Sequence, residues 1–248
     1  MIFLFPFFLL ANPSNPTIAN GSAQITQQEN RLTVDQKTDK AIIHWEDFSI
    51  KEGETTIFQQ PNSSSQILNR VTSDIPSSIY GSLKANGQVY LINPNGIHIG
   101  PKGEINTSAF IASALNTSNE EFLSGEYRFK GSSPLKNEGT IHATGNIFLF
   151  AKTIENTGTI QSGGKTALAS SSELYFYDKE EKVLVKKEAE GTLHQKGLIE
   201  AASIELKSAG DNLYALAINQ EGILSANSIQ EENGRILLKA EKNTVSHS

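Results

Sequence analysis

Beyond residue 20 the chain consists of short stretches in which apolar and polar residues alternate. The clearest stretches cover residues 31–34, 41–44, 89–92, 147–151 and 236–240, with Asn-Gly, Glu-Gly and Ser-Gly pairs between them. Alternation with a period of two places every second side chain on one face of a strand, and such Gly-containing pairs favour turns. The pattern therefore predicts an all-β fold.

Helical periodicity is weak throughout the chain. The best candidate, residues 107–123, is interrupted by the polar residues 116–119. We therefore expect one or two helical turns at most, around residues 119–123.

Internal repeats narrow the fold class. The segment NEGTIHATGNIFLFAKTIE (137–155) is followed directly by NTGTIQSGGKTALASSSEL (156–174), and QKGLIEAASIE (195–205) is similar to QEGILSANSIQ (220–230). A Gly-x-Ile-x-Leu-x-Ala pattern at 145–151 also returns at 234–240. The matched positions are Asn137/Asn156, Gly139/Gly158, Thr140/Thr159, Ile141/Ile160, Gly145/Gly164 and Leu149/Leu168 in the first pair, and Gln195/Gln220, Gly197/Gly222, Ala201/Ala226, Ser203/Ser228 and Ile204/Ile229 in the second.

Units of 19 to 25 residues without a helix are typical of the coils of a β-solenoid. Each coil places apolar side chains inside, and its strands pair in parallel with the coils above and below. Asn and Gly are expected to recur because each coil turns the same corner, where Gly supplies a positive φ and Asn tolerates it. A β-sandwich with chance similarity between its strands is the alternative.

Residues 173–194 interrupt the repeat. Residues 174–177 and 183–185 read as two strands joined by a charged turn at 178–182. We expect an antiparallel hairpin that projects from the solenoid. Its alternating Lys and Glu residues would discourage pairing of its edge with other strands.

The N-terminus MIFLFPFFLLA (1–11) is apolar and has no acidic residue. It is shorter than the roughly 20 residues that span a bilayer. It fits the apolar region of a secretory signal peptide, although no basic side chain precedes it. Small residues allow cleavage after Ala11 or after Ala19, and a buried N-terminal strand is the alternative.

Composition indicates a soluble, mildly acidic protein and argues against nucleic-acid binding. The formal net charge is −6 and hydrophobic residues make up 38% of the chain. A nucleic-acid surface needs clustered Lys and Arg, which are scattered here. Cysteine is absent. An exported domain of this size either needs no disulfide or must stay unfolded while it crosses a second membrane.

Candidate catalytic and metal sites are weak, so we expect neither an enzyme nor a cofactor. Polysaccharide cleavage on a solenoid needs converging carboxylates. The aspartates fall at no repeated position, the five histidines show no zinc-binding spacing, and no Gly-x-Ser-x-Gly motif occurs. The aspartates concerned are Asp35, Asp39, Asp47, Asp74, Asp178 and Asp211.

Residues 21–61, 67–100 and the following AFIASALN resemble the haemagglutination-activity domain, also called the two-partner-secretion (TPS) domain, of filamentous-haemagglutinin-like exoproteins. The resemblance is strong over about residues 12–170 and rests on elements in family order. These are His44-Trp45-x-x-Phe48, Asn69-Arg70-Val71, Gly81-Ser82-Leu83, Asn86-Gly87 and Asn93-Pro94-Asn95-Gly96-Ile97.

The resemblance implies a single-stranded right-handed parallel β-helix, with an N-terminal cap and an extra-helical antiparallel hairpin, over residues 12–248. It also implies a route. Such a domain passes the Sec translocon and binds the periplasmic polypeptide-transport-associated (POTRA) domains of a TpsB-type outer-membrane β-barrel. It crosses that barrel unfolded and folds outside, so the expected location is the exterior or surface of a Gram-negative bacterium.

Two departures limit the resemblance. The Asn-Pro-Asn-Leu motif of some family branches is missing, and family exoproteins usually continue far beyond the point where this sequence ends. A short exoprotein and a fragment of a longer one are both compatible with the sequence.

The resemblance also marks candidate site residues. Asn93, Pro94, Asn95, Gly96 and Ile97 are expected to form a type I turn that the transporter reads or that stabilises the cap. Asn69 and Arg70 are likewise expected either to be read by the transporter or to have a structural role.

Two groups of aromatic residues are further candidates. Trp45 and Phe48 are expected to plug the open N-terminal end of the β-helix. A self-contained adhesin that binds host cells or glycans is the alternative function, with Tyr175, Phe176 and Tyr177 as its candidate surface.

Overall fold

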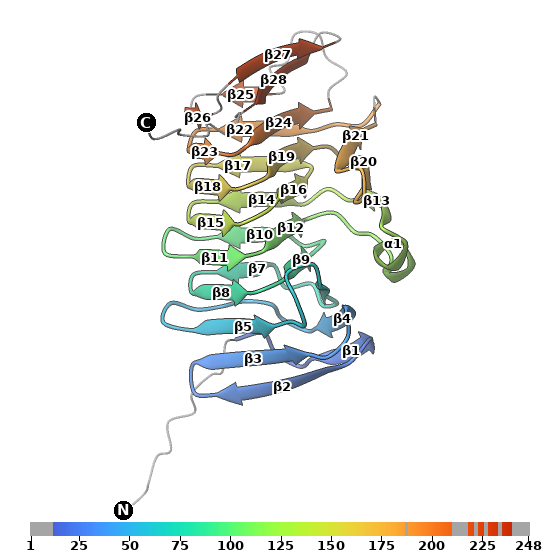
Figure 1. The fold of residues 1–248 in the computed structure, drawn as a ribbon, viewed down its shortest axis with the longest axis vertical. Helices are drawn as coiled ribbons and strands as arrows, with labels where there is room; N and C mark the ends of the chain where they lie inside the picture. The colour runs from blue at the N-terminus through green and yellow to red at the C-terminus, as the bar shows by residue number, and fades with distance from the viewer. Residues whose placement is uncertain are drawn as a thin grey trace, which may run out of the picture.

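A computed structural model describes residues 12–186, 188–209, 218–220, 223–225, 228–232 and 235–239. The candidate signal segment 1–11 lies outside these residues, as do the repeat positions Gly222, Ala226, Gly234 and Ala240. In Figure 1 the strands stack as successive coils along the long axis of the molecule, from β1–β3 at one end to β26–β28 at the other. The predicted all-β parallel β-helix is confirmed.

Three sheets form the walls of the helix, and neighbouring strands in each list are hydrogen-bonded. The first sheet contains β1 (Thr17–Asn20), β4 (Lys40–Trp45), β6 (Gln66–Val71), β9 (Gln88–Ile92), β12 (Ala109–Ser113), β16 (Ile147–Ala151), β19 (Lys165–Ser170), β24 (Ser203–Ser208), β28 (Arg235–Lys239) and β27 (Ser228–Glu232). The second contains β2 (Ala23–Gln28), β3 (Arg31–Gln36), β5 (Thr55–Gln59), β8 (Ser82–Ala85), β11 (Glu104–Thr107), β15 (Thr140–Ala143), β18 (Thr159–Ser162), β23 (Leu198–Glu200) and β26 (Ile223–Ser225). The third contains β7 (Ser77–Ile79), β10 (Ile97–Ile99), β14 (Pro134–Asn137), β17 (Thr153–Asn156), β22 (Thr192–Gln195) and β25 (Ile218–Gln220).

The 19-residue repeat sets which residues pair between two consecutive coils of the β-helix. Asn137 pairs with Asn156, Ile141 with Ile160, and Leu149 with Leu168, each in a parallel ladder. Both isoleucines and both leucines are fully buried in the interior core. Residues 19 positions apart therefore lie one above another in these two coils.

Corner glycines are required by close approach rather than by a positive φ, which corrects the expectation. A Cβ on Gly158 would lie 2.2 Å from the carbonyl oxygen of Gly139, and one on Gly197 would lie 2.0 Å from that of Gly158. None of these three glycines, all in the described part of the chain, has a positive φ, and neither do Asn137 and Asn156. The backbones stack so tightly at this corner that only hydrogen fits.

The second repeat pair agrees with the strand pairing in the second and third sheets but not in the first. Gln195 pairs with Gln220 and Leu198 with Ile223, as the offset of 25 predicts. The expected match of Ser203 and Ile204 with Ser228 and Ile229 is wrong, because β24 pairs with β28 in the antiparallel sense and β27 pairs only with β28. A returning strand at this end of the first sheet replaces the next parallel neighbour.

A fourth, outer sheet packs against the first sheet from outside. It contains β13 (Glu126–Lys130), β20 (Glu173–Tyr177) and β21 (Lys182–Val185), all antiparallel, and it follows α1 (Asn119–Ser124). The predicted hairpin is confirmed as β20 and β21, and the predicted helical turns as α1. Strand β13 was not predicted.

The alternation expected at residues 89–92 and 147–151 is absent, since every one of these positions is buried, and the outer sheet explains why. Strands β12 and β16 are buried at every position, because one face lines the interior of the helix and the other faces the outer sheet. This second core is rich in aromatic residues: Tyr90, Phe122, Tyr127, Phe129, Phe148, Phe150 and Phe176.

Candidate functional site

The NPNG segment is a tight turn between β9 and β10, as predicted. The Gly96 amide donates to the Asn93 carbonyl at 3.1 Å, and the Asn95 amide donates to the Asn93 side-chain oxygen at 3.0 Å. Gly96 has φ of +117°, a value that side-chain-bearing residues rarely adopt. Asn93 is fully buried, and Ile97 extends into the interior core.

The side chains of this turn bind the preceding coil. Asn93 Nδ2 donates to the Ile75 carbonyl and to Ser77 Oγ, both at 2.9 Å. Asn95 Nδ2 donates to the Ser73 carbonyl at 2.7 Å. Both amides are therefore used to hold the segment that leads into β7.

The same turn also contacts the following coil. Ser133 Oγ donates to the Pro94 carbonyl at 2.5 Å, and Pro134 lies against Gly96, where an added Cβ would be 3.3 Å from the Pro134 carbonyl oxygen. The NPNG turn thus joins three successive coils, and Pro94 and Asn95 are its half-buried residues.

Asn69 is an internal residue of β6. It is fully buried, accepts a hydrogen bond from Trp45 Nε1 at 2.9 Å and donates to the Tyr90 carbonyl at 3.4 Å. An asparagine at this position satisfies the indole N–H that the buried tryptophan would otherwise leave without a partner.

Arg70 lies on the outer side of β6 and faces α1. Its Nη1 donates to Asn116 Oδ1 at 2.6 Å. Burial lowers its pKa, and the charges of Glu120 and Glu121 oppose that shift. Arg70 therefore links the first sheet to the segment before α1, and its backbone lies opposite Ile92, the residue that precedes the NPNG turn.

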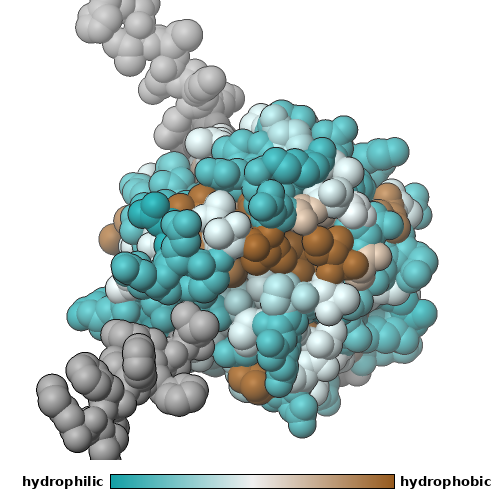
Figure 2. Space-filling model, turned by 90° about the horizontal axis from the view of Figure 1, so that it is seen from below, coloured by the Kyte–Doolittle hydropathy of each residue, from teal (hydrophilic) through white to brown (hydrophobic). Residues whose placement is uncertain are grey.

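The N-terminal end of the β-helix is covered by β1 and β2, which pair with β4 and β3 in the antiparallel sense, rather than by Trp45 and Phe48. These two rings are fully buried, 5.7 Å apart and edge-on, inside the coil that contains β4. Strands β1 and β2 lie beyond them, with half-buried Ala23 and Ile25 packed on the core. Figure 2 shows an apolar area at the centre of this end, surrounded by hydrophilic residues.

The three aromatic residues of β20 divide between two faces of the outer sheet. Tyr175 and Tyr177 are half-buried on its outer face. Phe176 is fully buried, with its ring 4.8 Å from that of Phe148, so its placement in an exposed adhesive surface is wrong. Strand alternation is the physical reason, since residue 176 must face opposite to its two neighbours.

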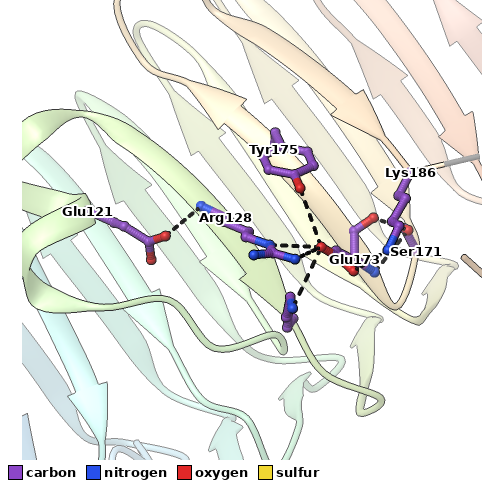
Figure 3. Close-up of polar contacts among 7 residues, drawn as sticks. Glu121, Arg128, Ser171, Glu173, Tyr175 and Lys186 are labelled. Carbon is purple, nitrogen blue, oxygen red and sulfur yellow. Dashed lines mark hydrogen bonds and ion pairs between the residues drawn. The ribbon is translucent and has the colours of Figure 1, made fainter.

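An ion cluster surrounds Glu173 on this outer face (Figure 3). Its carboxylate accepts from Arg128 at 2.6 Å and from Lys186 at 3.0 Å, and Lys130 Nζ lies 3.8 Å away. The Glu173 side chain is only 12% exposed. Hydrogen bonds from Arg128 and Lys186 lower its pKa to about 2, so the carboxylate stays ionised.

A second polar contact fixes the turn between β20 and β21 against the first sheet of the β-helix. Asp178 accepts from Tyr90 Oη at 3.0 Å and from Gln66 Nε2 at 2.9 Å. Burial is the main cause that raises the Tyr90 pKa well above its ordinary value, so the phenol remains a donor. The alternation of aromatic and charged residues in EYRFK (126–130) was the sequence signal for this outer layer, and it was missed.

Neither a metal-binding group nor a membrane-spanning helix is found among the described residues. The described part of the chain contains no group of three or more His, Cys, Asp or Glu side chains that could hold a metal ion. Within the same residues no helix is long and apolar enough to cross a bilayer.

Comparison with known proteins identifies relatives. A family model described as the TPS secretion domain matches residues 10–248. Two heme/hemopexin-binding proteins of Haemophilus influenzae are 31% and 30% identical over 92% and 86% of this chain. The matches cover 27% and 26% of those proteins, so the chain spans about a quarter of their length.

Solved structures agree with this result. The HMW1 secretion domain from Haemophilus influenzae has a TM-score of 0.68 and 31% identity, covering 79% of this chain and 57% of that one. The filamentous hemagglutinin secretion domain has a TM-score of 0.57 and 13% identity, covering 86% of this chain and 95% of that one. The second likeness concerns the fold alone.

Proposed function

The chain belongs to the family of TPS secretion domains, and we propose that it directs its own export through the POTRA domains of a cognate outer-membrane β-barrel. In this proposal the chain enters the periplasm by the Sec route and reaches the transporter unfolded. It then passes through the barrel and folds at the cell surface. The family assignment already implies a hemagglutinin-like exoprotein with a dedicated transporter.

The observation that carries the proposal is the use of the NPNG amides inside the fold. The side-chain amides of Asn93 and Asn95 donate hydrogen bonds to Ile75, Ser77 and Ser73, which lie one coil away. In the folded chain these donors are not available to a transporter. We infer that the motif acts on export through folding, by locking one coil to the previous one as it emerges.

Coil-by-coil folding fits a chain that emerges from a pore. Each coil contacts mainly its neighbours, so the fold can grow from the N-terminal end without waiting for distant segments. Completed coils cannot return through the barrel while folded. The absence of cysteine supports the same route, because no disulfide loop can obstruct threading.

The test is export of an Asn95→Ala chain from cells that express the cognate transporter. Loss of the donor to the Ser73 carbonyl should cost about 1 kcal/mol of folding free energy. Secretion and the urea midpoint of the purified domain should therefore fall together. Asn106→Ala is the matched control, because Asn106 is exposed on the outer face of β11.

Two outcomes would contradict the proposal at different points. Normal stability of Asn95→Ala with lost secretion would mean that the transporter reads the motif directly. Secretion of the wild-type chain from cells lacking the transporter would remove the POTRA route altogether.

A further inference from the structure

The sequence contains four Asn-Gly pairs, at 20–21, 86–87, 95–96 and 233–234, and the structure describes the first three. In such a pair the glycine backbone nitrogen can attack the Cγ atom of the asparagine side chain, because glycine has no Cβ to hinder the approach. A C–N bond forms and ammonia leaves, and water then opens the five-membered succinimide to aspartate or isoaspartate. The reaction needs a backbone amide and a side chain that are both free to move.

In the folded chain the pair Asn95–Gly96 is held at both reacting groups. The Gly96 amide donates to the Asn93 carbonyl at 3.1 Å, and the Asn95 side chain donates to the Ser73 carbonyl at 2.7 Å. Pro134 crowds the site from the following coil, since its carbonyl oxygen would lie 3.3 Å from a Cβ on Gly96. Closure of the succinimide ring would have to break both hydrogen bonds in a turn that contacts the coils on either side.

The other two described pairs differ from each other. The Asn86 side chain accepts from the Gln60 amide at 2.7 Å and donates to the Gln60 carbonyl at 2.8 Å, so it is held as firmly as Asn95. Asn20 and Gly21, by contrast, are exposed at the end of β1. Among the described pairs the fold therefore protects two and leaves one open to solvent.

A deamidated residue 95 does not fit the turn. The Asn95 side-chain nitrogen lies 2.7 Å from the Ser73 carbonyl oxygen and 3.3 Å from Asn93 Oδ1. An oxygen in its place would face two acceptors with no proton between them. Asn93 cannot turn its own amide to compensate, because its nitrogen donates to the Ile75 carbonyl and to Ser77 Oγ. The isoaspartate product would in addition lengthen the backbone of the turn by one atom.

We propose that Asn95–Gly96 is a deamidation site of the unfolded chain, which folding closes and whose product no longer forms the turn. Its bearing on export rests on the proposed function, in which the chain reaches the transporter unfolded. A chain retained in that state would lose the Asn95 donor that locks one coil to the previous one. A chain that has folded keeps the motif intact, because the turn protects its own asparagine.

Peptide mass spectrometry of the purified full chain, kept in mildly alkaline buffer either folded or in concentrated urea, tests the site. In urea Asn20, Asn86 and Asn95 should all be converted to aspartate and isoaspartate, because local sequence alone sets the rate there. In the folded chain Asn95 and Asn86 should react at least about a hundredfold more slowly than in urea, because only the small unfolded fraction is open to attack. Asn20 should show the smallest protection of the three.

The variant Asn95→Asp tests the consequence of the modification. Its urea midpoint should lie below that of Asn95→Ala, because the alanine only removes a donor whereas the aspartate also sets a charge against two acceptor oxygens. Asn106→Asp adds the same charge on the exposed face of β11 and should unfold like the wild type.

Aged wild-type chain gives the same answer if Asn95→Asp does not fold. The chain is kept in urea until it is partly deamidated, the urea is removed, and the folded and unfolded fractions are separated. Deamidated residue 95 should be enriched in the unfolded fraction. Deamidated residue 20, which lies exposed at the end of β1, should be divided more evenly between the two fractions.

Three results would overturn the proposal. They are equal deamidation of Asn95 in the folded chain and in urea, a urea midpoint of Asn95→Asp equal to that of the wild type, and equal content of deamidated residue 95 in the two fractions of the aged chain. None of these readouts uses the transporter. Export from cells that lack the transporter would remove the proposed function and leave the modification site standing, so the two failures are distinguishable.

Discussion

Asn137 Nδ2 donates a hydrogen bond of 2.7 Å to Oδ1 of Asn156, the equivalent residue of the next coil. Asn156 Nδ2 in turn donates at 2.7 Å to Gln195 Oε1 of the coil after that. All three side chains are fully buried. The amides form a ladder along the corner of the β-helix, in which Asn156 accepts from the coil before it and donates to the coil after it.

Breaking the middle of this ladder should destabilise the protein strongly. Asn156→Ala leaves the Asn137 donor and the Gln195 acceptor without partners in a buried site. We expect the free energy of unfolding to fall by about 2–5 kcal/mol, measured by urea denaturation. Gln161→Ala, on the outer side of the same coil, should cost less than about 1 kcal/mol. Equal losses of unfolding free energy in the two variants would show that the buried ladder stabilises the fold no more than an outer side chain does.

The glycine corner predicts a second, distinguishable effect. Gly158→Ala places a Cβ 2.2 Å from the Gly139 carbonyl oxygen and should cost about 1–3 kcal/mol or more by overpacking. Gly158→Asn should be at least as damaging, because the larger side chain meets the same carbonyl. If Asn were tolerated much better than Ala in thermal unfolding, a left-handed backbone would be the true requirement at this corner.

The amide ladder and the close glycine contact, both at the same corner, show what sequence could and could not provide. Identical residues at an offset of 19 reveal which positions stack, because stacking demands equivalent shapes in every coil. They do not reveal why Gly recurs, since a positive φ and a close approach of two backbones both select glycine. The sequence likewise showed that Asn137 recurs as Asn156, but it did not show that their side chains are hydrogen-bonded.

The outer layer was only half predictable. The β20–β21 hairpin has a charged turn and two apolar strands, so local sequence was sufficient. Strand β13 lies more than 40 residues before its partner β20, and no local pattern announces that pairing. Phe176 was misplaced for a different reason, since alternation along a strand already excludes one face that holds residues 175, 176 and 177 together.

The second core predicts that Phe176 anchors the outer sheet. Its ring lies 4.8 Å from Phe148 and 5.4 Å from Phe150 of the first sheet. Phe176→Ala should lower the free energy of unfolding by about 3–5 kcal/mol, as large-to-small changes in buried cores do. Tyr175→Ala, one position earlier on the opposite face, should change stability much less. Comparable urea midpoints for the two variants would contradict the assignment.

Acid should release the cation cluster at Glu173. The folded-state pKa of about 2 lies below the ordinary 4.5, so this carboxylate stabilises the fold above pH 4.5 and loses that effect as pH falls towards 2. The difference in unfolding free energy between wild type and Glu173→Gln should therefore shrink over this window and vanish below it. A difference that stays constant from pH 7 to pH 2 would exclude the linkage.

Residues 12–19 are integral to the N-terminal end of the fold. Asn12 is buried and accepts from Thr56 Oγ1 at 3.1 Å. The Ser14 amide donates to the Asp47 carbonyl at 2.9 Å, and its carbonyl accepts from Glu46. Strand β1 then pairs with β4 in the antiparallel sense, with Thr17 opposite His44. A chain that begins after Ala19 would lose nearly all of these contacts.

Signal processing should therefore occur after Ala11 and not after Ala19. N-terminal sequencing of the secreted protein is expected to begin at Asn12. A recombinant chain of residues 12–248 should unfold cooperatively, whereas one of residues 20–248 should be less stable, because β4 then gains an unpaired edge and Thr56 loses its buried partner. Detection of Asn20 as the mature N-terminus, together with equal stability of the two chains, would show that the first strand is dispensable and that cleavage follows Ala19.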